Sequence, residues 1–409
     1  MPSLPYREGA SGVKPDPLTS AFLRAARLKI KEIHREWAGD RLKIGLFAFG
    51  GHGDLMRLMT FAAAVRKRYP RERAHITLIC KYINPTYHEP SDRTAAVEGW
   101  AVNDEIIRMV ALQPEFAIDH VVQLHLVRWE HAVRALRPRF DHFWEVQYVA
   151  GLTTTWRNRK RPSPWSAFQA KCNRQLKPWR GIFDGFAHSN PKLNGVGMTQ
   201  FETLAASSGL DVREDDLRIE VERHGDGTWR FGGRAWEPIV KLPEQPYVVW
   251  HNGAGGRAAM KCLPLALANE GVRVCRKAGL TAVQVGRRDK DILIDGVADY
   301  RGCSICDTAA LLSGSVGHFD IEGGIVYLSH ALGVPRCVFF GPTPTSLFGF
   351  KDSLNCSREV CEPCWWSVPD WDRKCKLGQR FCLNMPQTLG EMGVTVSLAL
   401  RAFKEVGRW

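Results

Sequence analysis

The sequence predicts an α/β protein of two halves, each an open parallel sheet with helical crossovers. From residue 42 onwards, short apolar segments alternate with helical patterns, which is the rhythm of strand–helix–strand units. A proline-containing joint at residues 242–246 interrupts that rhythm, which restarts with YVVW. The length of 409 residues suits two such domains. We therefore expect an N-terminal segment over residues 1–40, one domain over 41–241 and a second over 242–409.

The composition excludes several classes of protein. With 44% hydrophobic and 24% charged residues, the chain is neither disordered, collagen-like nor a disulfide-rich miniprotein. It has no run of 18 apolar residues and no secretion signal, so we expect a cytoplasmic protein. The formal net charge of +13 favours acidic partners: phosphorylated small molecules, anionic glycolipids or nucleic acid.

The N-terminal segment is expected to be a tail followed by an amphipathic helix. Apolar residues recur at helical spacing from Leu18 to Trp37, and the other positions are rich in Arg and Lys. Such a helix could lie on the anionic surface of the inner membrane, or dock onto the body of the protein or a neighbouring subunit. The sequence leaves both interpretations open.

The elements of the two halves follow in order. In the first half we expect a helix at residues 55–70 and strands at 43–50, 75–80, 106–110, 121–126 and 143–149. In the second half we expect strands at 247–250, 280–286, 316–320 and from 336, with a last helix at 388–406 that returns to the first half. Ligands of open parallel sheets bind beyond the carboxyl ends of the strands, so the turns after the strands are the candidate sites.

The first such turn is glycine-rich and leads to an acidic residue. Gly50, Gly51 and Gly53 precede Asp54, which opens the next helix. The positive end of a helix stabilises an ionised carboxylate by about 0.3–1 kcal/mol. Asp54 is therefore a candidate base, and a plain helix cap is the alternative. The turn is not GxGxxG, so a dinucleotide fingerprint is not indicated.

Two further glycine turns in the second half predict a phosphate-bearing ligand. Glycines let backbone N–H groups approach an anion, and nearby basic side chains supply charge for a diphosphate. A carboxylate beside them could accept hydrogen bonds from ribose or sugar hydroxyls. The candidate donor-binding residues are Asn252, Gly253, Ala254, Arg257, Lys261, Gly286, Glu322, Gly323 and Gly324. Asp289 and Asp291 follow Gly286, and we expect them to be solvated surface charges rather than adenosine contacts.

A basic, tryptophan-containing segment spans residues 152–183, with eight Lys or Arg and no acidic residue. Indole faces stack on sugar rings or bases, and clustered Arg pairs with phosphates. The segment could bind a phosphorylated glycan or single-stranded nucleic acid, or be a solvated loop. The candidate acceptor-binding residues are Trp156, Arg157, Arg159 and Lys160.

Four cysteines lie within 22 residues near the C-terminus: Cys361, Cys364, Cys375 and Cys382. Two closely spaced thiols followed by two more suit a structural four-cysteine site for zinc or iron. Free buried thiols and a disulfide pair are the alternatives. Because a closed site of this kind is structural, we expect it to order the segment 361–382.

Four strings resemble, in order and spacing, glycosyltransferase family 9, the ADP-heptose:lipopolysaccharide heptosyltransferases. They are GHGDLMRLMTFAAAVRKRYP, HNGAGGRAAMKCLP, IEGGIVYLSHALGVPRCVFFGPT and CEPCWW with CKLGQRFCL. The resemblance implies a GT-B fold, in which two Rossmann-like domains face each other across a cleft. It further implies inverting transfer of heptose from an ADP-heptose-type donor to a hydroxyl of lipopolysaccharide core, with no catalytic metal.

The resemblance also implies roles for individual residues. Asp54 matches the family's catalytic base, Lys261 the lysine that binds the donor phosphates, and residues 322–324 the donor-binding turn. Glu322 stands where Asp is common, and Tyr327 where many members have His. An iron-binding cysteine segment marks the branch that glycosylates autotransporter proteins. A protein O-heptosyltransferase acting on Ser is therefore an alternative, as is a basic nucleic-acid-binding protein without enzymatic activity. No nucleic-acid motif is present, so no specific nucleic acid is expected.

Overall fold

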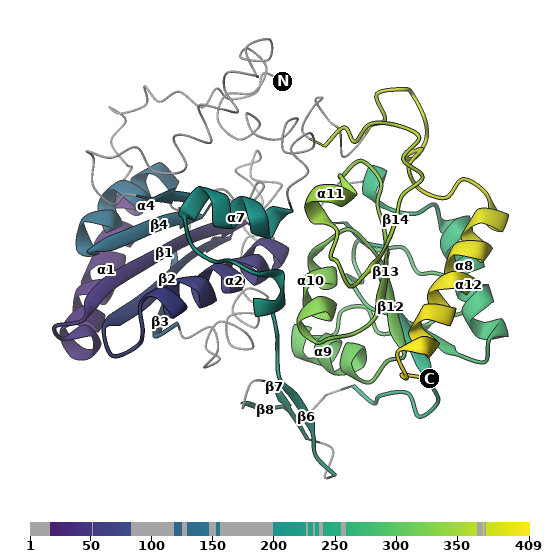
Figure 1. The fold of residues 1–409 in the computed structure, drawn as a ribbon, viewed down its shortest axis with the longest axis horizontal. Coiled ribbons are helices and arrows are strands. Elements are labelled where there is room, and N and C mark those ends of the chain that lie inside the picture. The colour runs from purple at the N-terminus through teal and green to yellow at the C-terminus, as the bar shows by residue number, and fades with distance from the viewer. Residues whose placement is uncertain are drawn as a thin grey trace. The chain divides into compact units, whose positions relative to one another are not determined.

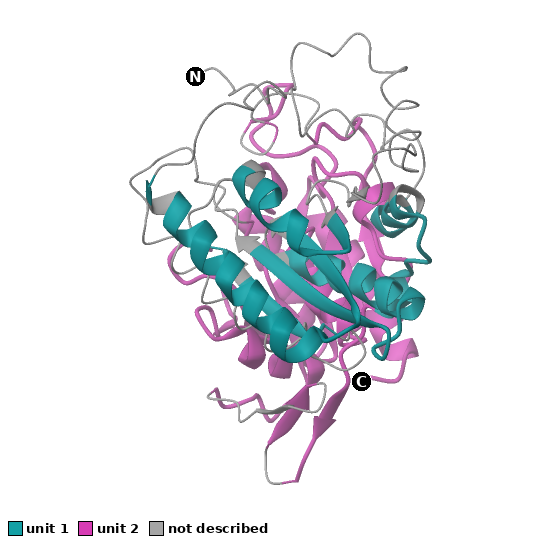
Figure 2. Ribbon diagram, turned by 90° about the vertical axis from the view of Figure 1, so that its left-hand side faces the viewer, with its two compact units in different colours: residues 1–216 teal, residues 217–409 magenta. Residues whose placement is uncertain are grey.

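A computed structural model describes most of the chain. The described residues are 17–50, 52–82, 118–124, 129–146, 153–155, 199–225, 228–231, 234–236, 240–254, 259–365, 371 and 374–409. Two compact units contain them, residues 1–216 and 217–409 (Figure 2). The predicted joint at 242–246 thus falls inside the second unit, between a small antiparallel sheet and the first strand of the large sheet.

The first unit is built on a five-stranded sheet of order β3-β2-β1-β4-β5 (Figure 1). Strands β1 to β4 are parallel, and β5 is antiparallel to β4. The strands are β1 (Leu42–Gly50), β2 (Ala74–Tyr82), β3 (His120–Leu124), β4 (His142–Val146) and β5 (Thr153–Thr155). The helices are α1 (Pro17–Ile33), η1 (His34–Ala38), α2 (His52–Arg68), α4 (Trp129–Leu136), η3 (Arg137–Arg139), α7 (Gln200–Ser208) and η5 (Glu214–Asp216). The strand predicted at 106–110 lies outside the described residues.

Helix α1 docks onto its own unit. Leu23, Ala26, Ile30 and Ile33 recur at helical spacing and are buried in one cluster with side chains of β1 to β4 and α4. The Arg27 Nε group also donates a hydrogen bond of 3.1 Å to the backbone carbonyl of Ala135. The apolar face of this helix is therefore occupied by the protein itself, as the docking interpretation predicts.

A change of helix type explains why Trp37 leaves that face. Residues His34–Ala38 form a π-helical turn, which inserts an extra residue relative to α-helical spacing. Ala38 takes the buried position, at 1% exposure, while Trp37 is 57% exposed. The predicted placement of Trp37 on the apolar face was wrong for this reason.

The second unit is built on a six-stranded, all-parallel sheet of order β11-β10-β9-β12-β13-β14. Its strands are β9 (Tyr247–Trp250), β10 (Thr281–Gln284), β11 (Ala298–Asp299), β12 (Gly317–Ile321), β13 (Arg336–Phe339) and β14 (Leu354–Cys356). Its helices are η6 (Ala259–Lys261), α8 (Leu265–Lys277), α9 (Ile305–Ser313), α10 (Gly324–Ala331), α11 (Thr345–Phe348) and α12 (Leu389–Glu405). Strands β6 (Val221–Arg223), β7 (Trp229–Phe231) and β8 (Arg234–Trp236) form the separate antiparallel sheet. The two α/β sheets confirm the predicted fold class.

Helix α12 packs on the second unit and beside α8 (Figure 1). Phe403 is buried against Phe319 of β12, with ring centroids 5.4 Å apart. A Cβ atom on Gly317 would lie 2.3 Å from the Phe403 ring, so this position has room only for glycine. The expectation that the last helix returns to the first half was therefore wrong.

No helix among the described residues combines the length and the apolar character needed to cross a membrane.

Candidate functional site

The predicted turns follow the central strand of each sheet, where the order of the strands reverses. Strand β1 has β2 on one side and β4 on the other, and β9 lies likewise between β10 and β12. The connections from such a central strand leave toward opposite faces, which opens a crevice at the carboxyl ends of the strands. The turn before Asp54 follows β1, and the loop that carries Lys261 follows β9.

Asp54 lies in the first turn of α2 and forms an ion pair with Arg57. The Arg57 Nη2 atom lies 3.1 Å from Asp54 Oδ1. The two side chains differ sharply in burial, since that of Asp54 is 26% exposed and that of Arg57 only 1%. A buried guanidinium thus lies behind a partly exposed carboxylate and favours its ionised form.

Arg57 also ties α2 to α7. Its Nη1 atom donates to the side-chain oxygen of Gln200 at 3.4 Å, and Gln200 is fully buried. We did not predict a role for Arg57 from the sequence. The signal was its position three residues after Asp54, because side chains at i and i+3 are neighbours on a helix.

The loop after β9 is closed at its base by Asn252. The Asn252 side chain accepts a hydrogen bond from the Leu263 N–H at 2.8 Å and donates one to the Leu263 carbonyl at 2.9 Å. Both polar groups of the amide are therefore engaged across the two ends of the loop. Asn252 fixes the loop that carries Lys261, and Ala254 lies within that loop.

Lys261 and Glu322 form an ion pair between the two predicted turns. Lys261 Nζ lies 2.5 Å from Glu322 Oε2, and both side chains are largely buried, at 16% and 11% exposure. The structure thus brings together a cation and a carboxylate from the turns after two neighbouring strands, β9 and β12.

The glycine turn after β12 leads directly into α10. Gly323 is the residue before that helix and Gly324 is its first residue, so their N–H groups belong to the helix N-terminus. Tyr327 is buried, with its ring 5.1 Å from the Phe350 ring in an edge-on arrangement. Tyr327 is thus part of the packing beneath the turn.

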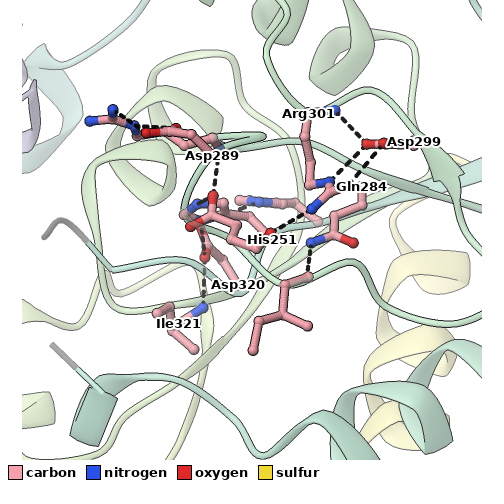
Figure 3. Close-up of polar contacts among 11 residues, drawn as sticks. His251, Gln284, Asp289, Asp299, Arg301, Asp320 and Ile321 are labelled. Atoms are coloured by element: carbon pink, nitrogen blue, oxygen red, sulfur yellow. Dashed lines mark hydrogen bonds and ion pairs between the residues drawn. The ribbon is translucent and has the colours of Figure 1, made fainter. Parts of the chain in front are cut away.

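His251 connects the starts of both turns (Figure 3). Its Nδ1 atom lies 2.7 Å from Asp320 Oδ1, and the same oxygen accepts a hydrogen bond from the Ile321 N–H at 2.7 Å. On the other side of the ring, Nε2 lies 3.7 Å from Asp291 Oδ2. The imidazole is therefore placed between two carboxylates.

Asp291 is largely buried, contrary to the expectation of a solvated surface charge. Its side chain is 8% exposed, whereas that of Asp289 is 60% exposed, as expected. The Asp291 carboxylate accepts a hydrogen bond of 2.5 Å from the Arg287 N–H. Cβ atoms on Gly253 and Gly286 would lie 2.1 and 2.3 Å from it, and Gly286 has a φ of +127°. The carboxylate therefore packs against both backbones, and Gly286 also has a backbone conformation that favours glycine.

Burial and charge shift the pKa values of this cluster. Burial raises the pKa of Asp320 to about 6. Burial alone would lower the pKa of His251, but the charge and hydrogen bond of Asp320, with the charge of Asp291, outweigh it and raise that pKa. Burial lowers the pKa of His318, the other histidine beside Asp320, well below its usual value. Of the two histidines beside Asp320, His251 is therefore the one whose charged form the cluster favours.

The four C-terminal cysteines line one pocket together with Met260, Trp371 and Asn384. The Asn384 side chain accepts a hydrogen bond from the Cys361 N–H at 2.9 Å and donates one to the Cys361 carbonyl at 2.7 Å. Among the described residues, no three of these sulfur atoms all lie within 4.8 Å of one another. The segment gathers the thiols around a common space, but they are further apart than the ligands of a closed metal site.

Five predicted site residues lie outside the described residues: Trp156, Arg157, Arg159, Lys160 and Arg257.

Comparisons with known proteins show the fold. No protein-family model matches the chain, and no curated protein matches its sequence. Among solved structures, it is similar to the iron-containing dodecameric glycosyltransferase TibC from enterotoxigenic E. coli H10407. The identity is 14% and the TM-score 0.52, and the match covers 90% of this chain and 77% of TibC. A second structure of TibC, with ADP-D-beta-D-heptose, matches equally well.

A glycosyl transferase family 9 protein from Veillonella parvula is also similar, with 13% identity and a TM-score of 0.50. The match covers 89% of this chain and 98% of that one. The chain thus has the GT-B fold of these glycosyltransferases.

Proposed function

We propose that the protein is an inverting glycosyltransferase of family 9 that transfers heptose from an ADP-heptose-type donor to a hydroxyl of lipopolysaccharide core. The observation that carries the proposal is the Lys261–Glu322 pair on two turns at the carboxyl ends of β9 and β12. It offers a cation for a diphosphate and a carboxylate for sugar or ribose hydroxyls at the place where parallel sheets bind ligands. The fold shared with a heptosyltransferase solved with ADP-heptose supports this donor.

The reaction assigns one role to each group. The Asp54 carboxylate accepts the proton of the acceptor hydroxyl, and the oxygen attacks the anomeric carbon from the face opposite the diphosphate. The bond between that carbon and the donor phosphate oxygen breaks, and ADP leaves with its added negative charge. Lys261 and the N–H groups of Gly323 and Gly324 stabilise this charge. The donor phosphates replace Glu322 as the partner of Lys261, which frees Glu322 for hydroxyl groups.

The remaining candidate residues act on the shape of the donor site. Asn252 closes the loop that carries Ala254, Arg257 and Lys261. Gly253 and Gly286 leave room for the Asp291 carboxylate.

The basic segment with Trp156, Arg157, Arg159 and Lys160 is proposed to bind the anionic acceptor, because cations and indole rings together suit a phosphorylated glycan.

The four cysteines are proposed to hold a structural zinc or iron ion. Thiolates are the preferred ligands of both metals in closed sites, and the four thiols share one pocket. The similarity to an iron-containing glycosyltransferase supports iron. A bound ion would draw the four sulfurs together, and it would hold them beside Met260, which lines the same pocket.

The acceptor is tested by measuring ADP release from ADP-heptose. We expect release with a heptose-deficient lipopolysaccharide, and heptose attached to that glycan by mass spectrometry. Heptose on Ser residues of an autotransporter passenger domain would instead support protein glycosylation. The enzymatic proposal would be wrong if neither acceptor gave ADP and oligonucleotides bound more tightly than ADP.

The Lys261→Ala variant should lose ADP affinity about tenfold or more, whereas Lys290→Ala, at an exposed site, should not.

A further inference from the structure

We propose that His251 is a positioning residue for the donor, which locks together the three turns after β9, β10 and β12 by pairing with Asp320 and Asp291. The inference rests on the proposed donor site and explains how its parts are held in place. His251 touches neither Lys261 nor Glu322 in any contact described above, so it acts through the backbone that carries them.

The first step is the geometry of the ring. Asp320 Oδ1 lies 2.7 Å from Nδ1, and Asp291 Oδ2 lies 3.7 Å from Nε2. A neutral imidazole carries a proton on one nitrogen only, so its other lone pair would face a carboxylate. Only the imidazolium, with an N–H group on each side, is attracted by both carboxylates. The two carboxylates therefore favour a protonated ring.

The second step is what each carboxylate holds. Asp320 is the last but one residue of β12, two residues before Glu322, and its Oδ1 also accepts a hydrogen bond from the Ile321 N–H at 2.7 Å. Asp291 packs against the backbones of Gly253 and Gly286 and accepts the Arg287 N–H at 2.5 Å. Through these two contacts His251 fixes the start of the Glu322 turn and the start of the Lys261 loop. Figure 3 shows His251 beside Asp320 and Ile321.

The third step concerns the other charges around the ring. His318 lies on the far side of Asp320, with Nε2 3.5 Å from Asp320 Oδ2, and burial keeps it neutral. Among the described residues, other charged or titratable side chains of these turns are Lys261, Cys262, Arg287, Asp289, Arg301 and Glu322, together with the exposed Arg288, Lys290 and Asp295. Lys261 and Glu322 neutralise each other, as do Arg287 and Asp289, and Arg301 pairs with Asp299. Asp320 and Asp291 are thus the charges that decide the protonation of His251.

The consequence is a pH-dependent donor affinity. When His251 loses its proton, the pair with Asp291 becomes repulsive, and the turns that carry Lys261 and Glu322 are no longer held at their binding separation. ADP affinity should therefore fall as the pH rises through the raised pKa of His251.

The experiment measures the ADP dissociation constant by calorimetry from pH 6.5 to pH 9 for the full chain. For wild type we expect weaker binding at the alkaline end. For His251→Gln and Asp291→Asn we expect affinity about tenfold lower at pH 7, without the alkaline loss, because removing either partner of a coupled pair removes its interaction. The double variant should be no weaker than either single one. Asp289→Asn, which changes an exposed neighbouring carboxylate, is the matched control and should behave as wild type.

Two further measurements distinguish a loss of folding from a loss of binding. Thermal melting should show that Asp291→Asn, which preserves the shape of the side chain, is folded at pH 7. The NMR signal of the His251 ring, assigned by its loss in His251→Gln, should remain that of an imidazolium at pH 7. Equal ADP affinity for Asp291→Asn and Asp289→Asn, or a neutral His251 ring at pH 7, would overturn the inference. A wild type that binds no ADP at any pH would overturn the proposed donor and this role together.

Discussion

At the scale of single residues, the candidate site depends on ion pairs whose members come from different turns. Lys261 and Glu322 were predictable, because each follows a strand within a glycine turn. His251 opens one of the quoted strings and Asp320 directly precedes another, but neither received a role from the sequence. Their contact depends on β9 and β12 being neighbours, and strand order cannot be read from hydrophobic periodicity. Asp291 was misjudged for the same reason, because part of its burial comes from Gly253 and His251 in the loop after the neighbouring strand β9.

Arg57 gives the residue-scale prediction. Replacing it with Met removes the buried cation that lies 3.1 Å from Asp54 and favours the ionised carboxylate. We expect the acidic limb of the pH–rate profile for ADP release to move to higher pH, and turnover near neutral pH to fall about tenfold. Arg57→Lys, which keeps the charge, should restore part of both losses. An unchanged profile in Arg57→Met would contradict a role for Arg57 in setting the state of Asp54.

At the scale of elements, most strands and helices of the second unit follow the predicted pattern, while the placement of helices does not. The pattern of an amphipathic helix indicates that one of its faces is buried, but it does not identify the element against which that face packs. For α12 the partners are α8 and strand β12 of the same unit, and Phe403 packs against Gly317 of that strand. For α1 the partner is the sheet of the first unit, and a π-helical turn redirects Trp37.

The cysteine segment gives the element-scale prediction. Burial raises the pKa of Cys382 to about 11, so this thiol is protonated without a metal, and metal binding must release its proton. Protein purified without chelator should contain about one equivalent of zinc plus iron. Cys361→Ser should lose most of it, whereas Cys303→Ser, outside the pocket, should keep it. Metal content below about half an equivalent in wild type would contradict the proposed site.

Metal loss should also affect the loop that carries Lys261 and is proposed to bind the donor. Met260 lines the cysteine pocket and directly precedes Lys261, and a Cβ atom on Gly341 would lie only 2.8 Å from the Met260 carbonyl oxygen. Because this packing leaves little free space, loosening of the segment should displace the start of η6. We expect Cys361→Ser to weaken ADP binding in addition to losing metal.

At the scale of the whole molecule, the two α/β units could be predicted from the alternation of strand and helix patterns. The order of strands within each sheet could not, although it decides which turns meet. The acceptor does not follow from the fold, because one fold can serve enzymes that use different substrates.

The most direct test of the central claim, that Asp54 is the base for sugar transfer, is the rate of ADP release by Asp54→Asn at saturating ADP-heptose and acceptor. The carboxamide cannot take the proton of the acceptor hydroxyl, so we predict a fall of about 10²- to 10⁴-fold. ADP affinity should stay within about twofold of wild type, because the change removes an interaction of the transition state. Asp211→Asn, at a largely exposed site, is the control. Transfer by Asp54→Asn at the wild-type rate would contradict the account.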